Sequence, residues 1–147
     1  MRTASDVLFF IYLFLMAIYD IKKRKIQLEC SAVVAVLLAI QQVCIVYRGE
    51  ISIAGVFWGM MVGVVLIGLS ILTKGAIGVG DGILFVISGL FLGIYENGIL
   101  LLLSLFFTAI AGGFLIMSKR VGKTYTLPFV PFVFIGYGVM CVWKMFG

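Results

Sequence analysis

The sequence predicts an all-α membrane protein with about six transmembrane helices. Hydrophobic residues make up 64% of its 147 positions and charged residues only 12%, whereas about a quarter of the residues in a soluble domain are charged. Too few polar side chains remain to cover a globule in water. Because a spanning helix needs about 20 apolar residues, the chain has room for about six helices joined by short loops.

Apolar segments separated by polar or glycine-rich stretches define these helices within a single transmembrane domain, residues 1–147. The helices are expected at about residues 7–21, 30–46, 51–72, 81–95, 99–117 and 127–142. The first segment has the length of a signal-peptide core. However, the basic cluster Lys22–Lys25 follows it rather than precedes it, and no cleavage site between small residues is evident. We therefore expect a retained first helix.

The distribution of lysine and arginine predicts which loops face the cytoplasm. With the N-terminus outside, the cytoplasmic loops hold Lys22, Lys23, Arg24, Lys25, Lys74, Lys119, Arg120 and Lys123, and the outer side holds Arg2, Arg48 and Lys144. Cytoplasmic loops carry the excess of basic residues, so both termini are expected outside. Cytoplasmic loops therefore account for the net charge of +5, which is no sign of a nucleic-acid partner. We expect a multi-pass protein in the bilayer of the cytoplasmic (inner) membrane.

Glycines four residues apart predict faces where helix backbones approach each other closely. Gly55, Gly59 and Gly63 share one face of the third expected helix, and Gly89 and Gly93 share one face of the fourth. Small residues at such spacing allow close packing of membrane helices. The plainer alternative is that glycine is simply common in membrane helices.

Two of the six carboxylates, Asp20 and Asp81, stand at the ends of apolar segments. Asp20 follows Val7–Tyr19, and Asp81 precedes Ile83–Tyr95. Each of these runs has 13 residues, about 20 Å of helix, which is short of the hydrocarbon thickness of about 30 Å. The deficit closes if each helix extends through its aspartate, which then lies at or just inside the cytoplasmic boundary. Carboxylates at such depth are costly and are functional candidates.

Glycines precede the second aspartate in the stretch Gly78-Val79-Gly80-Asp81. Gly78 and Gly80 permit positive φ and close backbone approach, so a tight turn can deliver Asp81 to a cavity. Plainer readings exist, because Asp20 could be a solvated cap or a partner of Arg24 four residues later, and a short glycine motif also occurs by chance. The position of both aspartates on one expected side of the membrane favours a functional pair.

Two carboxylates from different helices at one depth predict the catalytic pair of an aspartic protease. Close like charges resist double ionisation, so one proton is shared between the two groups. One carboxylate then acts as base on a water molecule while its protonated partner polarises the peptide carbonyl. The proton later reaches the leaving amine.

The residues that carry this prediction resemble those of the type IV prepilin peptidase family, membrane aspartic proteases with a Gly-x-Gly-Asp motif. Three features agree in order: Asp20 followed by a basic run and Ile26, the stretch Gly78–Asp81, and Leu127-Pro128-Phe129-Val130-Pro131-Phe132. The last is similar to the family's Pro-Phe-x-Pro-Phe signature. We expect Pro128 and Pro131 to shape the cavity wall rather than to take part in catalysis, and a plainer reading is that they only shape a first helical turn.

The resemblance implies that Asp20 and Asp81 are catalytic. It also implies prepilin or pilin-like substrates, whose basic leader is cut at the cytoplasmic face, typically after a glycine. The chain departs from the family pattern at Ile26-Gln27-Leu28, where Ile-Pro-Asn is common, and it shows no N-terminal domain with paired Cys-x-x-Cys motifs. It therefore resembles short, peptidase-only members such as those of Flp-type pili, and methylation of the new N-terminus is not expected.

Several alternatives remain open on the sequence alone. A small ion- or proton-coupled transporter would use Asp20 and Asp81 to bind a cation or relay protons, and a non-catalytic pilus assembly protein would need neither. Another Gly-x-Gly-Asp intramembrane protease is a further alternative, since Tyr19-Asp20 resembles the presenilin-type Tyr-Asp motif. With no histidine, three separated cysteines and six carboxylates, a metal centre is disfavoured, and no cofactor is expected. The sequence leaves a homo-oligomer open.

Overall fold

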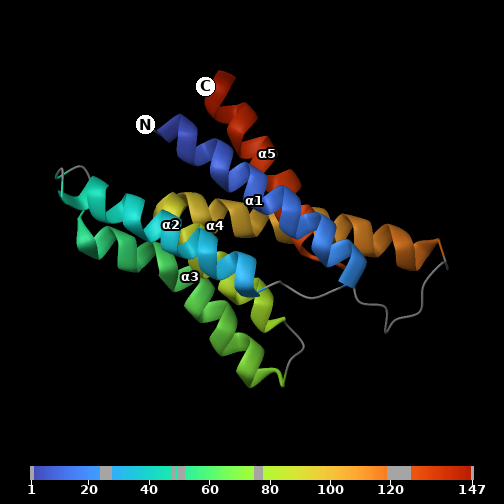
Figure 1. The fold of residues 1–147 in the computed structure, drawn as a ribbon. Coiled ribbons are helices and arrows are strands. Elements are labelled where there is room, and N and C mark those ends of the chain that lie inside the picture. The colour runs from blue at the N-terminus through green and yellow to red at the C-terminus, as the bar shows by residue number, and fades with distance from the viewer. Residues whose placement is uncertain are drawn as a thin grey trace. The chain divides into compact units, whose positions relative to one another are not determined.

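The regular structure of the described part of the chain is helical, as the hydropathy pattern predicts. The computed structural model describes residues 2–23, 28–47, 49, 52–74, 78–118 and 127–146. Within them lie α1 (Arg2–Lys23), α2 (Leu28–Tyr47), α3 (Ile53–Leu72), α4 (Val79–Met117) and α5 (Val130–Phe146), as Figure 1 shows. Several residues named in the topology and motif predictions lie outside this part: Arg24, Lys25, Ile26, Gln27, Arg48, Lys119, Arg120 and Lys123.

The helices gather into two compact units, residues 1–24 with 100–147 and residues 25–99. In the first unit, α1 and α5 run antiparallel, with the two chain termini at the same end of the pair (Figure 1). Each helix buries one face, and the buried residues recur every three or four positions, as on an amphipathic helix. They are Phe9, Tyr12, Leu13, Met16, Ala17 and Asp20 on α1, and Val130, Val133, Gly136, Tyr137 and Met140 on α5.

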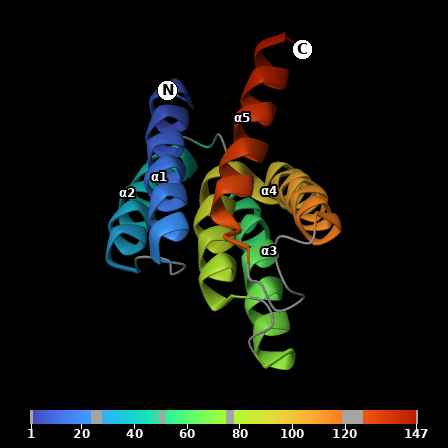
Figure 2. The same cartoon turned by 90° about the vertical axis from the view of Figure 1, so that its right-hand side faces the viewer.

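Glycines bring α3 and the first part of α4 together in the second unit, where the two helices lie side by side (Figure 2). A Cβ on Gly63 would lie 2.6 Å from the carbonyl carbon of Phe85, and one on Gly89 would lie 2.6 Å from that of Gly59. Real Cβ atoms do not approach backbone so closely, so only glycine permits this contact. The predicted packing faces are therefore confirmed at Gly59, Gly63 and Gly89.

A single residue, Gly93, interrupts α4 instead of the loop expected between Tyr95 and Ile99. Its φ of 76° and ψ of 176° are not helical, and a positive φ is tolerated best by glycine. A break of this kind leaves carbonyls of the preceding turn without N–H partners. The side-chain amide of Gln42 on α2 donates to one of them, the carbonyl of Leu90. The residues after Gly93 are helical, so the predicted turn at positions 96–98 is wrong.

Asn97 lies fully buried in the second unit, one turn after the break. Its Nδ2 donates to the carbonyl of Phe85 at 2.9 Å and to that of Gly59 on α3 at 3.1 Å. The hydroxyl of Ser88 donates to its Oδ1 at 2.7 Å. Buried polar groups are costly unless they are paired, and these three bonds join both arms of α4 to α3.

Replacement of Asn97 by leucine is expected to destabilise the protein by about 2 kcal/mol, because the Ser88 hydroxyl and two carbonyls each lose a partner. The S88A variant removes only one bond of the network and should cost about 0.6 kcal/mol, the average for such bonds in membrane proteins. Thermal unfolding in detergent measures both. Equal stability of N97L and the wild type would contradict the structural role of the network.

Two of the helices, α3 and α4, are long and apolar enough to cross a bilayer. Large apolar side chains project outward from both, among them Phe57, Trp58 and Val65 on α3 and Leu102, Phe106 and Ile110 on α4. Exposed apolar surface of this extent marks an interaction site or a membrane-facing surface.

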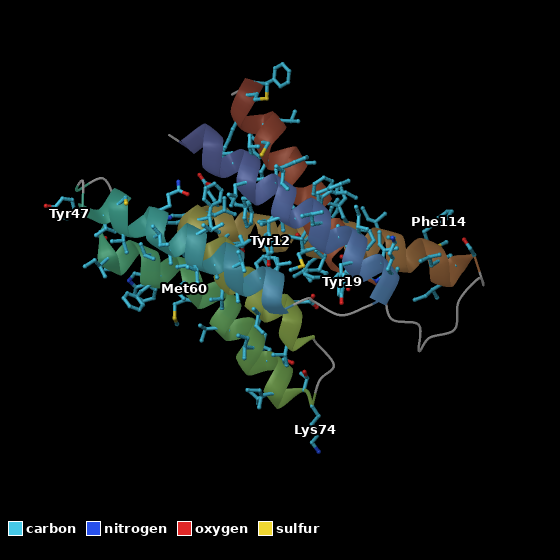
Figure 3. The ribbon with its side chains drawn as sticks, in the orientation of Figure 1. Tyr12, Tyr19, Tyr47, Met60, Lys74 and Phe114 are labelled. Carbon is cyan, nitrogen blue, oxygen red and sulfur yellow. The ribbon has the colours of Figure 1, made fainter. Side chains whose placement is uncertain are left out.

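Polar or charged residues stand at helix ends. Figure 3 shows Tyr47 at the end of α2 and Lys74 just beyond α3, at opposite ends of the second unit.

Candidate active site

The buried face of α1 ends in a carboxylate. Asp20 is only 8% exposed and continues the helical spacing of Met16 and Ala17 toward α5. Lys22, two residues further along, is exposed, because residues two apart on a helix do not share a face. The plain reading of Asp20 as a solvated cap is therefore wrong.

The start of α5 supplies a hydrogen bond to this carboxylate. The Val130 N–H donates to Oδ2 of Asp20 at 3.1 Å. Val130 is the first residue of α5, and N–H groups in the first turn of a helix have no acceptor within their own helix. The contact thus joins residues 110 positions apart in the sequence, and sequence reasoning missed it because a backbone donor has no side-chain signature.

The two prolines of the last segment lie on either side of this donor. Pro128 precedes α5 and Pro131 is its second residue, and both are half-buried. A proline in the first turn is tolerated because its missing N–H would have no partner there. The placement of Pro131 agrees with the plainer reading, in which it shapes the first turn. The expected role of the two prolines in shaping a cavity wall remains a prediction.

Asp81 is the third residue of α4 and lies in its first turn. Its N–H donates to the carbonyl of Gly78 at 3.1 Å, and its carboxylate folds back over the same residue. A Cβ on Gly78 would lie 2.9 Å from Oδ2 of Asp81. Gly78 therefore leaves space for the carboxylate. Gly80 is helical, as the second residue of α4, rather than part of the expected turn before the helix.

Both carboxylates are placed at the N-terminus of a helix, Asp20 at that of α5 and Asp81 at that of α4. A helix N-terminus carries a partial positive charge and favours a negative group there. The two residues belong to different units, Asp20 to the first and Asp81 to the second. Among the described residues, no group of three His, Cys, Asp or Glu side chains could hold a metal ion.

Since the sequence predicts that Asp81 is catalytic, the G78A variant is expected to lower activity about 100-fold with the fold retained. The new methyl group displaces the Asp81 carboxylate, and a 1 Å misplacement costs about that much. The matched control is G68A, since a Cβ at Gly68 meets no atom within 4 Å. Peptide cleavage by the two purified variants measures the difference. Wild-type activity of G78A would show that the position of the carboxylate over Gly78 is not required.

A second polar contact of the first unit was also missed. Asp6, near the N-terminus, is half-buried, and its Oδ1 accepts a hydrogen bond from the Tyr137 hydroxyl at 3.2 Å. The ring of Tyr137 packs edge-on against Phe9, with centroids 4.9 Å apart. A tyrosine in the middle of an apolar helix is a signal that its hydroxyl needs a partner when buried.

Comparison with known families supports the resemblance drawn from the motifs. The model of the type IV leader peptidase family matches residues 7–117. The match includes Asp20, Asp81 and the glycines before Asp81, and it ends before the segment Leu127–Phe132. No curated protein and no solved structure matches the chain. Since the family match covers more than half of the sequence, this membrane protein belongs to the type IV leader peptidase family and is a protease.

Proposed function

We propose that this protein is an aspartic endopeptidase that removes the basic leader of type IV prepilins or pilin-like precursors at the cytoplasmic membrane face. Asp20 and Asp81 are its catalytic pair. The observation that carries the proposal is the anchoring of Asp20, a carboxylate that is 8% exposed within an apolar helix pair and accepts the Val130 N–H. Such a costly group is retained where it has a function. Both aspartates also lie inside the family match.

The proposed topology uses the break in α4 to make six spanning segments in one domain of the inner membrane. They are α1, α2, α3, residues 79–92, residues 94–117 and α5. With both termini outside, α1 ends and α4 begins at the cytoplasmic face. Asp20, near the end of α1, and Asp81, near the start of α4, then lie on one side of the bilayer.

The proposed reaction needs only these two carboxyl groups and water. One ionised carboxylate takes a proton from the water as its oxygen attacks the scissile carbonyl, and the protonated partner donates a hydrogen bond to the carbonyl oxygen. Collapse of the tetrahedral intermediate breaks the C–N bond, and the leaving amine takes the proton. Close carboxylates share one proton and so supply both forms at once.

Reconstitution with a precursor substrate tests this function. The purified protein is placed in vesicles together with a precursor that has a basic leader, a glycine and a following hydrophobic helix, and the products are identified by mass spectrometry. We expect a single cut after the glycine, and a precursor with a bulky residue at that position serves as control. Intact precursor would contradict the proposal. Ion or proton flux through the vesicles, lost in D20N and D81N, would instead support the transporter alternative.

A further inference from the structure

The first turn of α5 offers few backbone donors to its surroundings. Pro131 has no N–H. The N–H groups of Phe132 and Val133 both donate to the carbonyl of Phe129, at 3.0 and 3.3 Å. Of the first four residues of α5, this leaves Val130, whose N–H donates to Oδ2 of Asp20. The turn therefore directs one backbone donor at one carboxylate oxygen.

Among the described side chains of the first unit, few charged groups belong to the helices around this contact. On α1, the titratable neighbours among the described side chains are Tyr19, half-buried one residue before Asp20, and the exposed Lys22; Tyr19 is labelled in Figure 3. Residues 100–117 of α4 include no titratable side chain, and α5 carries no charged residue before Lys144. The N-terminus of α5 adds a partial positive charge at the Asp20 carboxylate.

Resting on the function proposed above, we infer that the start of α5 is a positioning element, whose Val130 N–H holds Asp20 as the ionised carboxylate that takes the proton from the attacking water. A hydrogen bond to the charged form of a carboxyl group favours that form. It also fixes the direction of the carboxylate, because Oδ2 accepts the Val130 N–H at 3.1 Å. Because the two groups of the proposed pair share one proton, Asp81 is then the protonated partner.

The V130P variant tests this inference, with V130A as its matched control. Proline suits the first position of a helix, so V130P removes the N–H donor, while V130A removes a comparable part of the buried side chain and keeps the donor. We expect the acid limb of the pH profile of kcat/KM to move up by about one pH unit in V130P relative to V130A. The direction follows because Asp20 without its donor takes up a proton more readily, and activity is then lost at higher pH.

A second variant, P131A, should shift the acid limb of the pH profile in the opposite direction. P131A adds an N–H group beside that of Val130, and a further donor at the helix N-terminus favours the ionised carboxylate. The acid limb should therefore move to lower pH. A shift of the basic limb instead, in either variant, would make Asp20 the protonated partner and overturn the assignment; unchanged limbs in both variants would show that the contact has no part in catalysis.

A measurement without substrate separates this inference from the proposed function. In the D81N background, the carboxyl stretch of Asp20 is titrated by infrared spectroscopy of aspartate-labelled protein, with D20N/D81N as the reference. In this background too, Asp20 should take up its proton at a higher pH in V130P than in V130A. Equal titration of the two would overturn the positioning role even if the wild type cleaves prepilin, whereas a shift without any cleavage would leave the role intact and remove the proposed function.

Discussion

Asparagine at either catalytic position, D20N or D81N, is expected to abolish leader cleavage while the protein remains folded. An amide can neither take a proton from water nor donate one as a carboxylic acid does, and general acid–base catalysis contributes about 10²- to 10⁴-fold. Because the two groups share one proton, the loss of either disables both roles. The fold should survive in D20N, since the oxygen of the new amide side chain can still accept the Val130 N–H.

The control for these variants is the remaining aspartate. Asp6 accepts a hydrogen bond from Tyr137, so D6N retains an acceptor there and should cleave at the wild-type rate. Cleavage of precursor in vesicles and thermal unfolding in detergent are measured for all three variants. Near-normal processing by D20N or D81N would refute the catalytic pair.

Alanine at the tightest glycine contacts, G63A or G89A, is expected to lower the free energy of unfolding by about 3 kcal/mol, the upper end for overpacked cores. At Gly63 the new methyl group would meet the backbone of Phe85 and Val86, and at Gly89 it would meet the backbone of Gly59. A side chain could relieve such a clash by changing its rotamer, but backbone atoms cannot. The second unit must therefore separate α3 from α4, which also displaces the helix that carries Asp81.

The same substitution at Gly68 separates this clash from the helix-forming effect of alanine. Gly68 also lies on α3, and a Cβ there meets no atom within 4 Å. G68A should therefore keep or gain stability, by up to about 1 kcal/mol from helix propensity. Unfolding of the three variants is compared in the same detergent, and a loss in G68A equal to that in G63A would contradict the packing argument.

Composition and local sequence pattern were sufficient to predict the helical class, a helix-packing face and the family of this protein. Apolar segments predicted the helical class, because every backbone group in lipid must be paired within a helix or a closed barrel. The glycine spacing identified the face on which Gly59 and Gly63 meet α4. The motif around Asp20 and Asp81 led to the family that the comparison confirms. The six spans and the pairing of the two aspartates remain predictions.

The break in α4 was decided by tertiary structure. Residues on both sides of Gly93 are apolar, so hydropathy placed a turn at positions 96–98, after the true break. The conformation at Gly93 depends on partners from other helices, namely Gln42 for a released carbonyl and the Gly59 carbonyl for Asn97. The residues next to Gly93 in the sequence do not indicate which groups of other helices will bond to them.

Tertiary structure also decided how Asp20 is anchored. Its position at the end of an apolar run could be read from the sequence, but its burial and its bond to Val130 could not, because they require α1 and α5 to pack with Asp20 at the first turn of α5. The sequence by itself therefore determined which residues are candidates for chemistry. The tertiary structure decided the environment of Asp20, because burial and backbone donors come from segments far apart along the chain.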